Sequence, residues 1–235
     1  MTTPITLRHL GRLPYLAVWE AMRAFTDGRG PGTPDEMWLL EHPSVFTLGQ
    51  AGRDEHILDA GGIPVVHSDR GGQATYHGPG QVVLYLLLDL RRAGLGVKRL
   101  VRLLEQGVIA LLSREGVSGT ARPDAPGVYV DGAKIASLGL RVRNGRCYHG
   151  VALNVDLNLG PFARINPCGY PGLAVTRLVD LVEAPRGLAV VGDSLARCVA
   201  TSLGADLVVE PGETAPWNGP PRHLSALKNF SDSDA

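Results

Sequence analysis

The 235-residue sequence contains no long apolar run and no excess of either charge. Its longest apolar stretch, VVLYLLL at 82–88, is far shorter than the ~20 residues of a membrane helix. The N-terminus lacks a basic segment followed by an apolar one, so the sequence predicts no signal peptide. With 23 basic and 23 acidic residues, it also lacks the basic excess typical of nucleic-acid-binding proteins. We therefore expect a cytoplasmic protein that has neither a membrane nor a nucleic acid as its partner.

Cysteine is rare, and the sequence has only Cys147, Cys168 and Cys198, with no CxxC pair. An odd number of cysteines without such pairs argues against a disulfide framework and against a structural zinc site. The seven histidines show no HxxxH or HxH spacing, so we expect no metal site. This use of cysteine fits a reducing compartment such as the cytosol.

Lysine is scarce as well, because only Lys98, Lys134 and Lys228 stand among the 23 basic residues. The sequence uses arginine at nearly every position where a cation suffices. A lysine kept against this bias can serve chemistry that arginine cannot, since an ammonium gives up a proton far more easily than a guanidinium. The alternative is that each lysine is a chance survivor.

Apolar periodicity predicts helices over 15–25, 97–112 and 191–203, the last two closed by Gly116 and Gly204. Apolar or β-branched runs predict strands at 37–42, 44–50, 62–69, 82–90 and 147–159, of which the third and fourth are expected to be buried. Asp131-Gly132 lies between two strand-like runs, which is typical of a hairpin with a type I′ turn. We predict one α/β (α+β) domain with a mixed sheet over residues 1–210, followed by a Pro/Gly/Ser-rich surface tail over 211–235.

The segment SDRGGQATYHGPGQ, residues 68–81, is rich in glycine and lies between two predicted strands. Glycine allows backbone amides to approach a ligand closely. The segment matches neither GxxxxGK[ST] nor GxGxxG, so it does not indicate a nucleotide site. It is either a plain surface loop or a ligand-binding loop, and its side chains Arg70, Gln73 and His77 favour the second interpretation.

Cys168 is the cysteine with the strongest claim to chemistry, because it lies between Pro167 and Gly169 in the loop-like segment INPCGYPG. Cys198 falls in a predicted helix and is expected to pack, and Cys147 follows a turn. A thiol with an ordinary pKa of ~8.5 needs a neighbouring cation or base to form a thiolate at neutral pH. No histidine lies within fifteen residues of Cys168, so its partner must come from elsewhere in the chain.

Lys134 is one candidate partner, since it opens the second strand of the hairpin. If no bulge intervenes, its side chain lies on the same face as Ala136, Leu138, Leu140 and Val142. Desolvation there would favour the neutral amine, which is a base; a strand-end lysine that snorkels to water is the alternative. His149 alternates with Val151 and is expected to point inward, more as a core histidine than as a catalyst, whereas His77 in the glycine-rich segment has a better functional claim.

Five segments in order along the chain, RGGQATYHGPGQ, KIASLG, YHGVALNV, NPCG and VTRL, resemble the lipoyl(octanoyl) transferase family. The resemblance is dense from Ser68 to Leu178. It implies the fold of the biotin/lipoate protein ligase catalytic domain and an acyltransferase that moves octanoyl from acyl carrier protein to a lysine of a lipoyl domain. It implies no cofactor and no ATP, because the acyl group arrives on the phosphopantetheine of the carrier protein.

The resemblance also assigns roles to residues. The cysteine of the PCG motif is Cys168, which would carry the acyl group as a thioester. The lysine of the KIA motif is Lys134, which would favour the thiolate and relay protons, and His149 is a candidate supporting residue. The substrate-binding segments would comprise Arg70, Gly71, Gly72, Gln73, Ala74, Thr75, Tyr76, His77, Ser137, Leu138, Gly139, Gly150, Val151 and Ala152.

The implied partners are acyl carrier protein, the lipoyl domains of 2-oxoacid dehydrogenase complexes and the glycine cleavage H protein; we expect a monomer. Carrier proteins are acidic as a class, so we expect a local basic patch, either at Arg141, Arg143 and Arg146 or at Arg91 and Arg92. Three alternatives stay open. They are an ATP-dependent lipoate or biotin ligase, a thiol hydrolase that pairs Cys168 with His149 or His77, and a non-catalytic scaffold that binds lipoyl domains.

Overall fold

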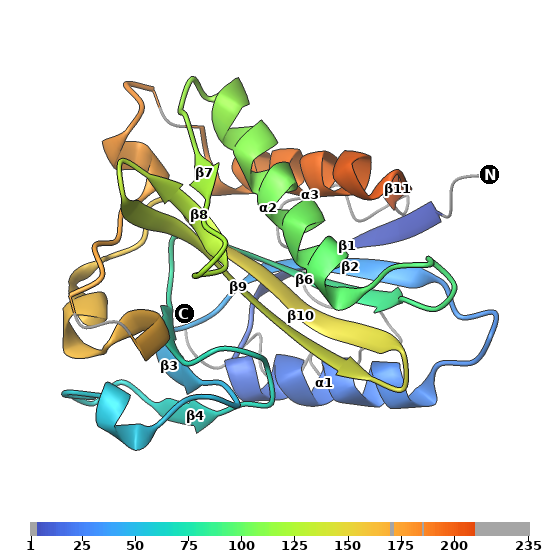
Figure 1. Cartoon of the computed structure of the whole chain (residues 1–235), viewed down its shortest axis with the longest axis horizontal. Coiled ribbons are helices and arrows are strands. Elements are labelled where there is room, and N and C mark those ends of the chain that lie inside the picture. The colour runs from blue at the N-terminus through green and yellow to red at the C-terminus, as the bar shows by residue number, and fades with distance from the viewer. Residues whose placement is uncertain (1–3, 170–171, 185, 210–235) are drawn as a thin grey trace.

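The computed structural model describes residues 4–169, 172–184 and 186–209, and its centre is an eight-stranded mixed sheet (Figure 1). The strand order is β11-β1-β2-β6-β10-β9-β8-β7. β1 runs parallel to β2 and β11, and every other neighbouring pair is antiparallel. The strands are β1 (Pro4–Arg12), β2 (Asp35–Glu41), β6 (Gln81–Asp89), β7 (Thr120–Ala121), β8 (Gly127–Val130), β9 (Ala133–Arg143), β10 (Arg146–Asn154) and β11 (Asp206–Val209). The predicted fold class is confirmed.

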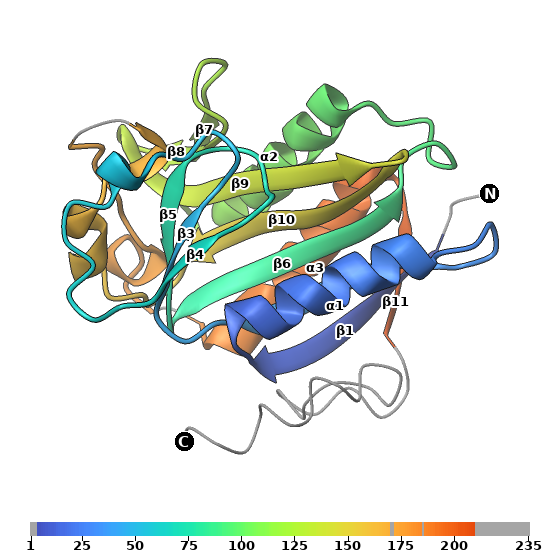
Figure 2. The ribbon, with the colours of Figure 1, turned by 90° about the horizontal axis from the view of Figure 1, so that it is seen from below.

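Helices cover both faces of the sheet, as Figure 2 shows from below. α1 (Tyr15–Gly28) lies on one face, and α2 (Val97–Arg114) and α3 (Leu188–Leu203) lie on the other. This arrangement explains the continuous apolar run of β6. Its alternate side chains Val82, Leu84 and Leu86 pack in the cluster with α2 and α3, while Val83, Tyr85 and Leu87 pack in the cluster with α1. Among the described residues, no helix has both the length and the apolar character needed to cross a membrane.

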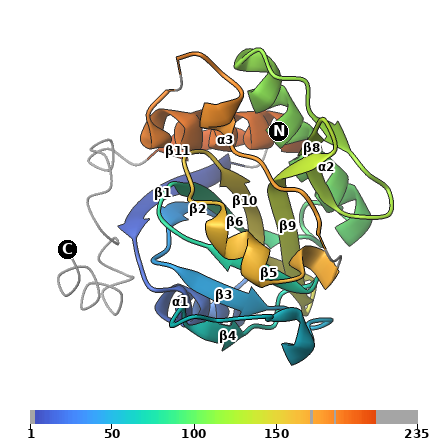
Figure 3. The same ribbon diagram turned by 90° about the vertical axis from the view of Figure 1, so that its left-hand side faces the viewer.

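A three-stranded sheet, β4-β3-β5, lies at one end of the main sheet beside the loops that follow β10 (Figure 3). Its strands are β3 (Val45–Leu48), β4 (Val65–His67) and β5 (Ala74–His77). Short 3-10 turns complete this end: η1 (Asp54–His56), η2 (Gly160–Arg164), η3 (Pro167–Gly169) and η4 (Leu178–Asp180). The prediction of a buried strand over 62–69 is wrong: β4 pairs only with β3 at a sheet edge, which leaves Val65 38% exposed.

The predicted turns and helix ends follow from glycine. Asp131 and Gly132 have φ of 49° and 83°, which confirms the type I′ hairpin between β8 and β9. α3 ends at Gly204, whose φ of 67° is the left-handed conformation common at helix C-termini. The strand predicted over 147–159 ends early, at Asn154, because the amides of Val155 and Asp156 turn to the carbonyl of Gly80 (3.2 and 2.9 Å).

Two of the three thiols belong to the core. Cys198 packs on α3 as predicted, and Cys147 lies fully buried in β10 with its Sγ 3.6 Å from the carbonyl oxygen of Leu86. Burial raises the pKa of Cys147 to about 12, so this thiol is inert at neutral pH. The tail predicted over 211–235 lies outside the described residues.

Candidate active site

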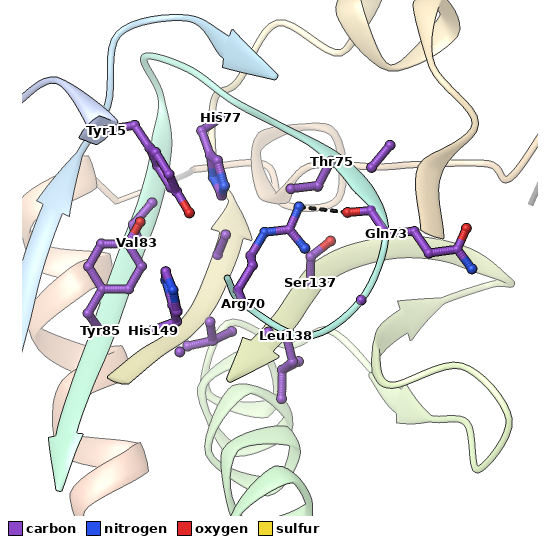
Figure 4. Close-up of a pocket in the computed structure, with 16 residues that line it drawn as sticks. Tyr15, Arg70, Gln73, Thr75, His77, Val83, Tyr85, Ser137, Leu138 and His149 are labelled. Atoms are coloured by element: carbon purple, nitrogen blue, oxygen red, sulfur yellow. Dashed lines mark hydrogen bonds between the residues drawn. The ribbon is translucent and has the colours of Figure 1, made fainter. Parts of the chain in front are cut away.

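A pocket of about 480 Å³ lies between the glycine-rich segment that leads into β5 and the face of β6, β9 and β10 below it (Figure 4). Apolar surface comes from Val83, Leu138, Val151 and Ala152, and polar groups converge on it from Arg70, Gln73, Ser137 and two histidines. The other residues lining it are Tyr15, Gly72, Ala74, Thr75, Tyr85, Gly139 and Gly150.

Close backbone approach holds this segment against the sheet. The amide of Gly71 donates to the carbonyl of Leu140 at 2.9 Å. A Cβ on Gly139 would lie 3.2 Å from the carbonyl oxygen of Gly71, and a Cβ on Gly150 would lie 2.1 Å from that of Leu84. Gly150 therefore has no room for a side chain because β6 lies against it, and the absence of a side chain at Gly139 lets the segment lie directly over β9.

Arg70 crosses the middle of the pocket and holds the glycine-rich segment in place through hydrogen bonds (Figure 4). Its Nη2 donates to the carbonyl oxygens of Thr47 and Gln73, both at 2.7 Å, and to Thr47 Oγ1 at 2.8 Å. Its Nη1 donates to the carbonyl of Gly71 at 3.0 Å. The guanidinium thus fixes the path of the glycine-rich segment and places a permanent positive charge beside the pocket.

One end of the pocket is lined by aromatic rings that fix one another. His42 Nδ1 donates to the carbonyl of Leu13 (2.7 Å), so its Nε2 accepts from the hydroxyl of Tyr85 (2.8 Å). His77 stacks on Tyr15 with ring centroids 5.6 Å apart. Burial is the main cause that lowers the pKa of His42 to about 4 and the pKa of His77 well below the ordinary value. Both rings are therefore neutral at neutral pH.

At this end of the pocket, Asp69 of the glycine-rich segment joins that segment to α1 and to β10. Its carboxylate accepts from Trp19 Nε1 on α1 (2.7 Å), from the Tyr148 hydroxyl, and from His149 Nε2 (3.0 Å). Burial works against its charge, yet the hydrogen bonds from His149, Tyr148 and Trp19 together hold the pKa of Asp69 well below its usual range. His149 points into the pocket beside Tyr148 because its φ of 65° interrupts the alternation of β10. Its ring contacts Tyr85 and Tyr148 of the cluster on the α1 face, whereas Val151 packs in the cluster on the other face. The expected shared face is therefore wrong, and the expected inward direction is confirmed.

We expect Asp69→Asn to lower the free energy of unfolding by about 1–2 kcal/mol at pH 7, through weakened charged hydrogen bonds. The folded-state pKa of Asp69 is depressed, so its contribution is complete above the unfolded value of ~4 and is lost as the pH falls further. The difference between the two proteins should therefore shrink between pH 4 and pH 2.5. Urea unfolding at several pH values measures it, and a constant difference would contradict this role.

Lys134 is 3% exposed, with its Nζ 5.4 Å from the centre of the Tyr129 ring. A register shift between Val128 and Tyr129 leaves Ile135 as the extra residue of a bulge next to Lys134 on β9, so the alternation with Ala136 fails and Lys134 lies over Tyr129 instead. The absence of a side chain at Gly127 makes room, since a Cβ there would lie 2.4 Å from the Cε of Lys134. Bulge and glycine together bury the lysine side chain.

The chain that follows Cys168 pairs with the backbone of Lys134. The amide of Lys134 donates to the carbonyl of Ala174 (2.8 Å), and the amide of Thr176 donates to the carbonyl of Lys134 (3.0 Å). The backbone of Cys168 lies in η3, and its side chain is outside the described part of the structure. A Cβ on Gly169 would lie 1.8 Å from Gln73 Oε1, so the turn of Cys168 packs directly on the glycine-rich segment.

This close approach gives a prediction with a matched control. Gly169 and Gly172 have similar positive φ values of 76° and 71°, so alanine strains both, but only at position 169 would the new Cβ meet Gln73. We expect Gly169→Ala to reduce acyl-enzyme formation at least tenfold and Gly172→Ala to reduce it less than threefold. Rates from intact-mass spectrometry would measure both, and equal losses would mean that backbone strain alone matters.

The structure brings most of the predicted binding residues to one pocket and leaves two out. Gly71 contributes only its backbone bond to Leu140, and the Tyr76 ring packs between Phe46 and Phe162 outside the pocket. Sequence reasoning missed Tyr15, Val83 and Tyr85. Tyr15 begins a helix and the other two belong to a fully buried strand, so only the spatial arrangement reveals them.

Comparison with known proteins agrees with this geometry. The lipoyl protein ligase A/B catalytic domain matches residues 14–200. The octanoyltransferase of Chromohalobacter salexigens is 61% identical over 213 residues, covering 91% of this chain and 96% of the relative. That of Alkalilimnicola ehrlichii is 66% identical over 179 residues, covering 76% and 83%.

Solved structures show the same fold at low identity. A bipartite lipoate protein ligase from Thermoplasma acidophilum has a TM-score of 0.71 at 16% identity, covering 91% of this chain and 89% of that one. Biotin protein ligase from Aquifex aeolicus has a TM-score of 0.51 at 11% identity, covering 84% and 68%. The chain belongs to the lipoyl protein ligase A/B catalytic domain family and, within it, to the octanoyltransferases, which are acyltransferases.

Proposed function

We propose that this enzyme transfers octanoyl from acyl carrier protein to a lysine of a lipoyl domain, through a thioester on Cys168. Relatives that are 61% and 66% identical over the aligned residues are named octanoyltransferases. The observation that carries the proposal is the pairing of the Lys134 backbone with Ala174 and Thr176. This pairing fixes a buried lysine beside the loop that carries Cys168, whereas Cys147 and Cys198 are buried in the core.

The first half-reaction forms one thioester and breaks another. Lys134 accepts the thiol proton of Cys168, and the thiolate attacks the octanoyl carbonyl. The tetrahedral intermediate collapses, the pantetheine sulfur leaves, and Lys134 returns the proton to it. Because a thioester replaces a thioester, this step is close to isoenergetic.

The second half-reaction forms an amide. The ε-amine of the acceptor lysine attacks the Cys168 thioester, its excess proton passes to Lys134, and the cysteine sulfur leaves and is protonated again. An amide is more stable than a thioester, so the two half-reactions together are favourable in free energy without ATP. The backbone amide of Cys168 in η3 and amides of the glycine-rich segment are the candidate donors to the oxyanion.

The pocket suits the acyl chain. Gln73, which contacts η3, lines the pocket together with the apolar side chains of Val83, Leu138 and Val151. At ~0.8 kcal/mol for each buried methylene, an eight-carbon chain gains several kcal/mol from burial. This binding energy holds the carbonyl at Cys168 while water is excluded.

The two basic patches expected for carrier-protein docking differ in the structure. Arg92 forms an ion pair with buried Asp35 (2.7 Å), and Arg143 pairs with Asp27 (3.2 Å). Arg141 lies seven residues along β9 from Lys134, about 23 Å at strand spacing. Arg146 pairs with Asp89 in the sheet, and the amide of Leu90 donates to the carbonyl of Gly145 (2.9 Å), so the two patches lie side by side at that end of the sheet and can form one docking surface.

Incubation with octanoyl-loaded acyl carrier protein, followed by intact and peptide mass spectrometry, tests the proposal. We expect one octanoyl group on Cys168, which disappears when a lipoyl domain is added and reappears on the acceptor lysine. An ATP-dependent ligase would modify the domain only with free octanoate and ATP. A hydrolase would release octanoate, and a scaffold would bind without any adduct.

A further inference from the structure

The aromatic end of the pocket contains two buried imidazole nitrogens that have no partner among the described residues, His77 Nε2 and His149 Nδ1. His77 is 5% exposed and His149 is 1% exposed, and both residues line the pocket. Figure 4 shows the rings entering the same end of the pocket from opposite sides, from β5 and from β10. A buried polar atom without a partner normally receives one from a bound molecule.

The hydrogen bonds on the opposite ring nitrogens decide what that molecule must supply. His77 Nδ1 faces Gln81 Oε1 at 2.7 Å, and an amide oxygen only accepts, so the proton is on Nδ1. His149 Nε2 faces the carboxylate of Asp69 at 3.0 Å, so its proton is on Nε2. Burial also lowers the pKa of both rings and keeps them neutral. Each remaining nitrogen is therefore an acceptor, and the end of the pocket requires a donor.

A plain acyl chain cannot be that donor, because it carries no polar hydrogen. Resting on the proposed function, we propose that His77 and His149 hold a water molecule at the end of the acyl pocket, and that this water sets the upper limit of acyl-chain length. A water has two hydrogens, one for each nitrogen. Its oxygen can accept from the Tyr15 hydroxyl, which lines the same end, when Ser68 Oγ is the donor in the 2.7 Å hydrogen bond between Ser68 and Tyr15.

Magnitudes show why the chain does not displace this water. One further methylene gains about fourfold in binding. Removing the water leaves two buried acceptors without donors. Each unsatisfied acceptor weakens the binding of the acyl chain roughly 5- to 150-fold. A methylene and a water occupy similar volumes, about 30 Å³ for the water. A longer chain would therefore have to displace the water for little apolar gain, and it binds more weakly.

The test is a competition between octanoyl-pantetheine and nonanoyl-pantetheine on the full chain, read as the ratio of the two adducts on Cys168 by intact mass. We expect octanoyl to be favoured at least fivefold. His149→Phe and His77→Phe each replace an acceptor with an apolar ring, and each should lower the ratio at least fivefold. His149→Gln, which keeps a hydrogen-bonding group, should retain most of the preference. Tyr76→Phe on the same strand as His77 loses its hydroxyl to Ser44 outside the pocket and should leave the ratio unchanged.

The outcomes separate the two proposals. If neither thioester forms an adduct on folded protein, the proposed function fails. If octanoyl forms an adduct but both phenylalanine variants keep the original ratio, the proposed role of the water in limiting chain length is wrong, while the proposed function stands. Should a variant not fold, a high-resolution crystal structure of the unchanged enzyme decides: a water within about 3.2 Å of both nitrogens supports the inference, and its absence there overturns it.

Discussion

Cys168→Ser is expected to abolish octanoyl transfer, with a fall in kcat/KM on the order of 10⁴-fold or more. A serine hydroxyl has a much higher pKa than a thiol, so a neighbouring lysine does not convert it to the anion at neutral pH. Its oxygen ester would also be less reactive toward the acceptor amine than a thioester. Mass spectrometry of the enzyme and gel-shift detection of the octanoylated lipoyl domain measure the two half-reactions separately.

Cys198→Ala is the matched control for this change. Cys198 is buried on α3 within the core cluster away from the pocket, so its loss should lower stability modestly and leave the rate within threefold. Full transfer by Cys168→Ser in the absence of ATP would rule out the thioester. Transfer by the same variant only with ATP and free octanoate would identify a ligase instead.

Lys134→Arg is the second large effect, a loss of about 10²- to 10⁴-fold although the positive charge is retained. Arginine does not release its proton, so it can neither take the thiol proton nor return one to the leaving group. The site is also tight, because the Lys134 Cε fills the space that a side chain on Gly127 would need. A thermal melt must therefore show that the variant is folded.

The pH dependence distinguishes lost proton transfer from a misplaced side chain. A free thiol ionises by itself above a pKa of ~8.5, so the deficit of Lys134→Arg in acyl-enzyme formation should narrow as the pH rises from 7 to 9.5. A deficit that does not change with pH would indicate a steric defect. Lys98→Arg, at an exposed position on α2, should behave like the unchanged enzyme throughout.

Much of the fold could be predicted because its signals are local. The periodicity of 97–112, the run at 82–90 and the Asp131-Gly132 turn each depend on neighbours along the chain, and each prediction is confirmed. The three-stranded sheet could not be predicted from local sequence patterns, because β3 pairs in parallel with β4 and antiparallel with β5. Burial of β4 was predicted wrongly for the same reason, since an edge position is a property of the whole sheet.

The sequence by itself determined the motifs, and with them the family, the choice of Cys168 and Lys134 as candidates, and most residues of the pocket. Only the tertiary structure decided how they face one another. A bulge turned Lys134 onto Tyr129, a positive φ turned His149 into the pocket, and Asp69 joined α1 to β10. These outcomes arise where the chain departs from regular alternation. Such departures are stabilised by contacts with residues distant in sequence, so no local pattern contains them.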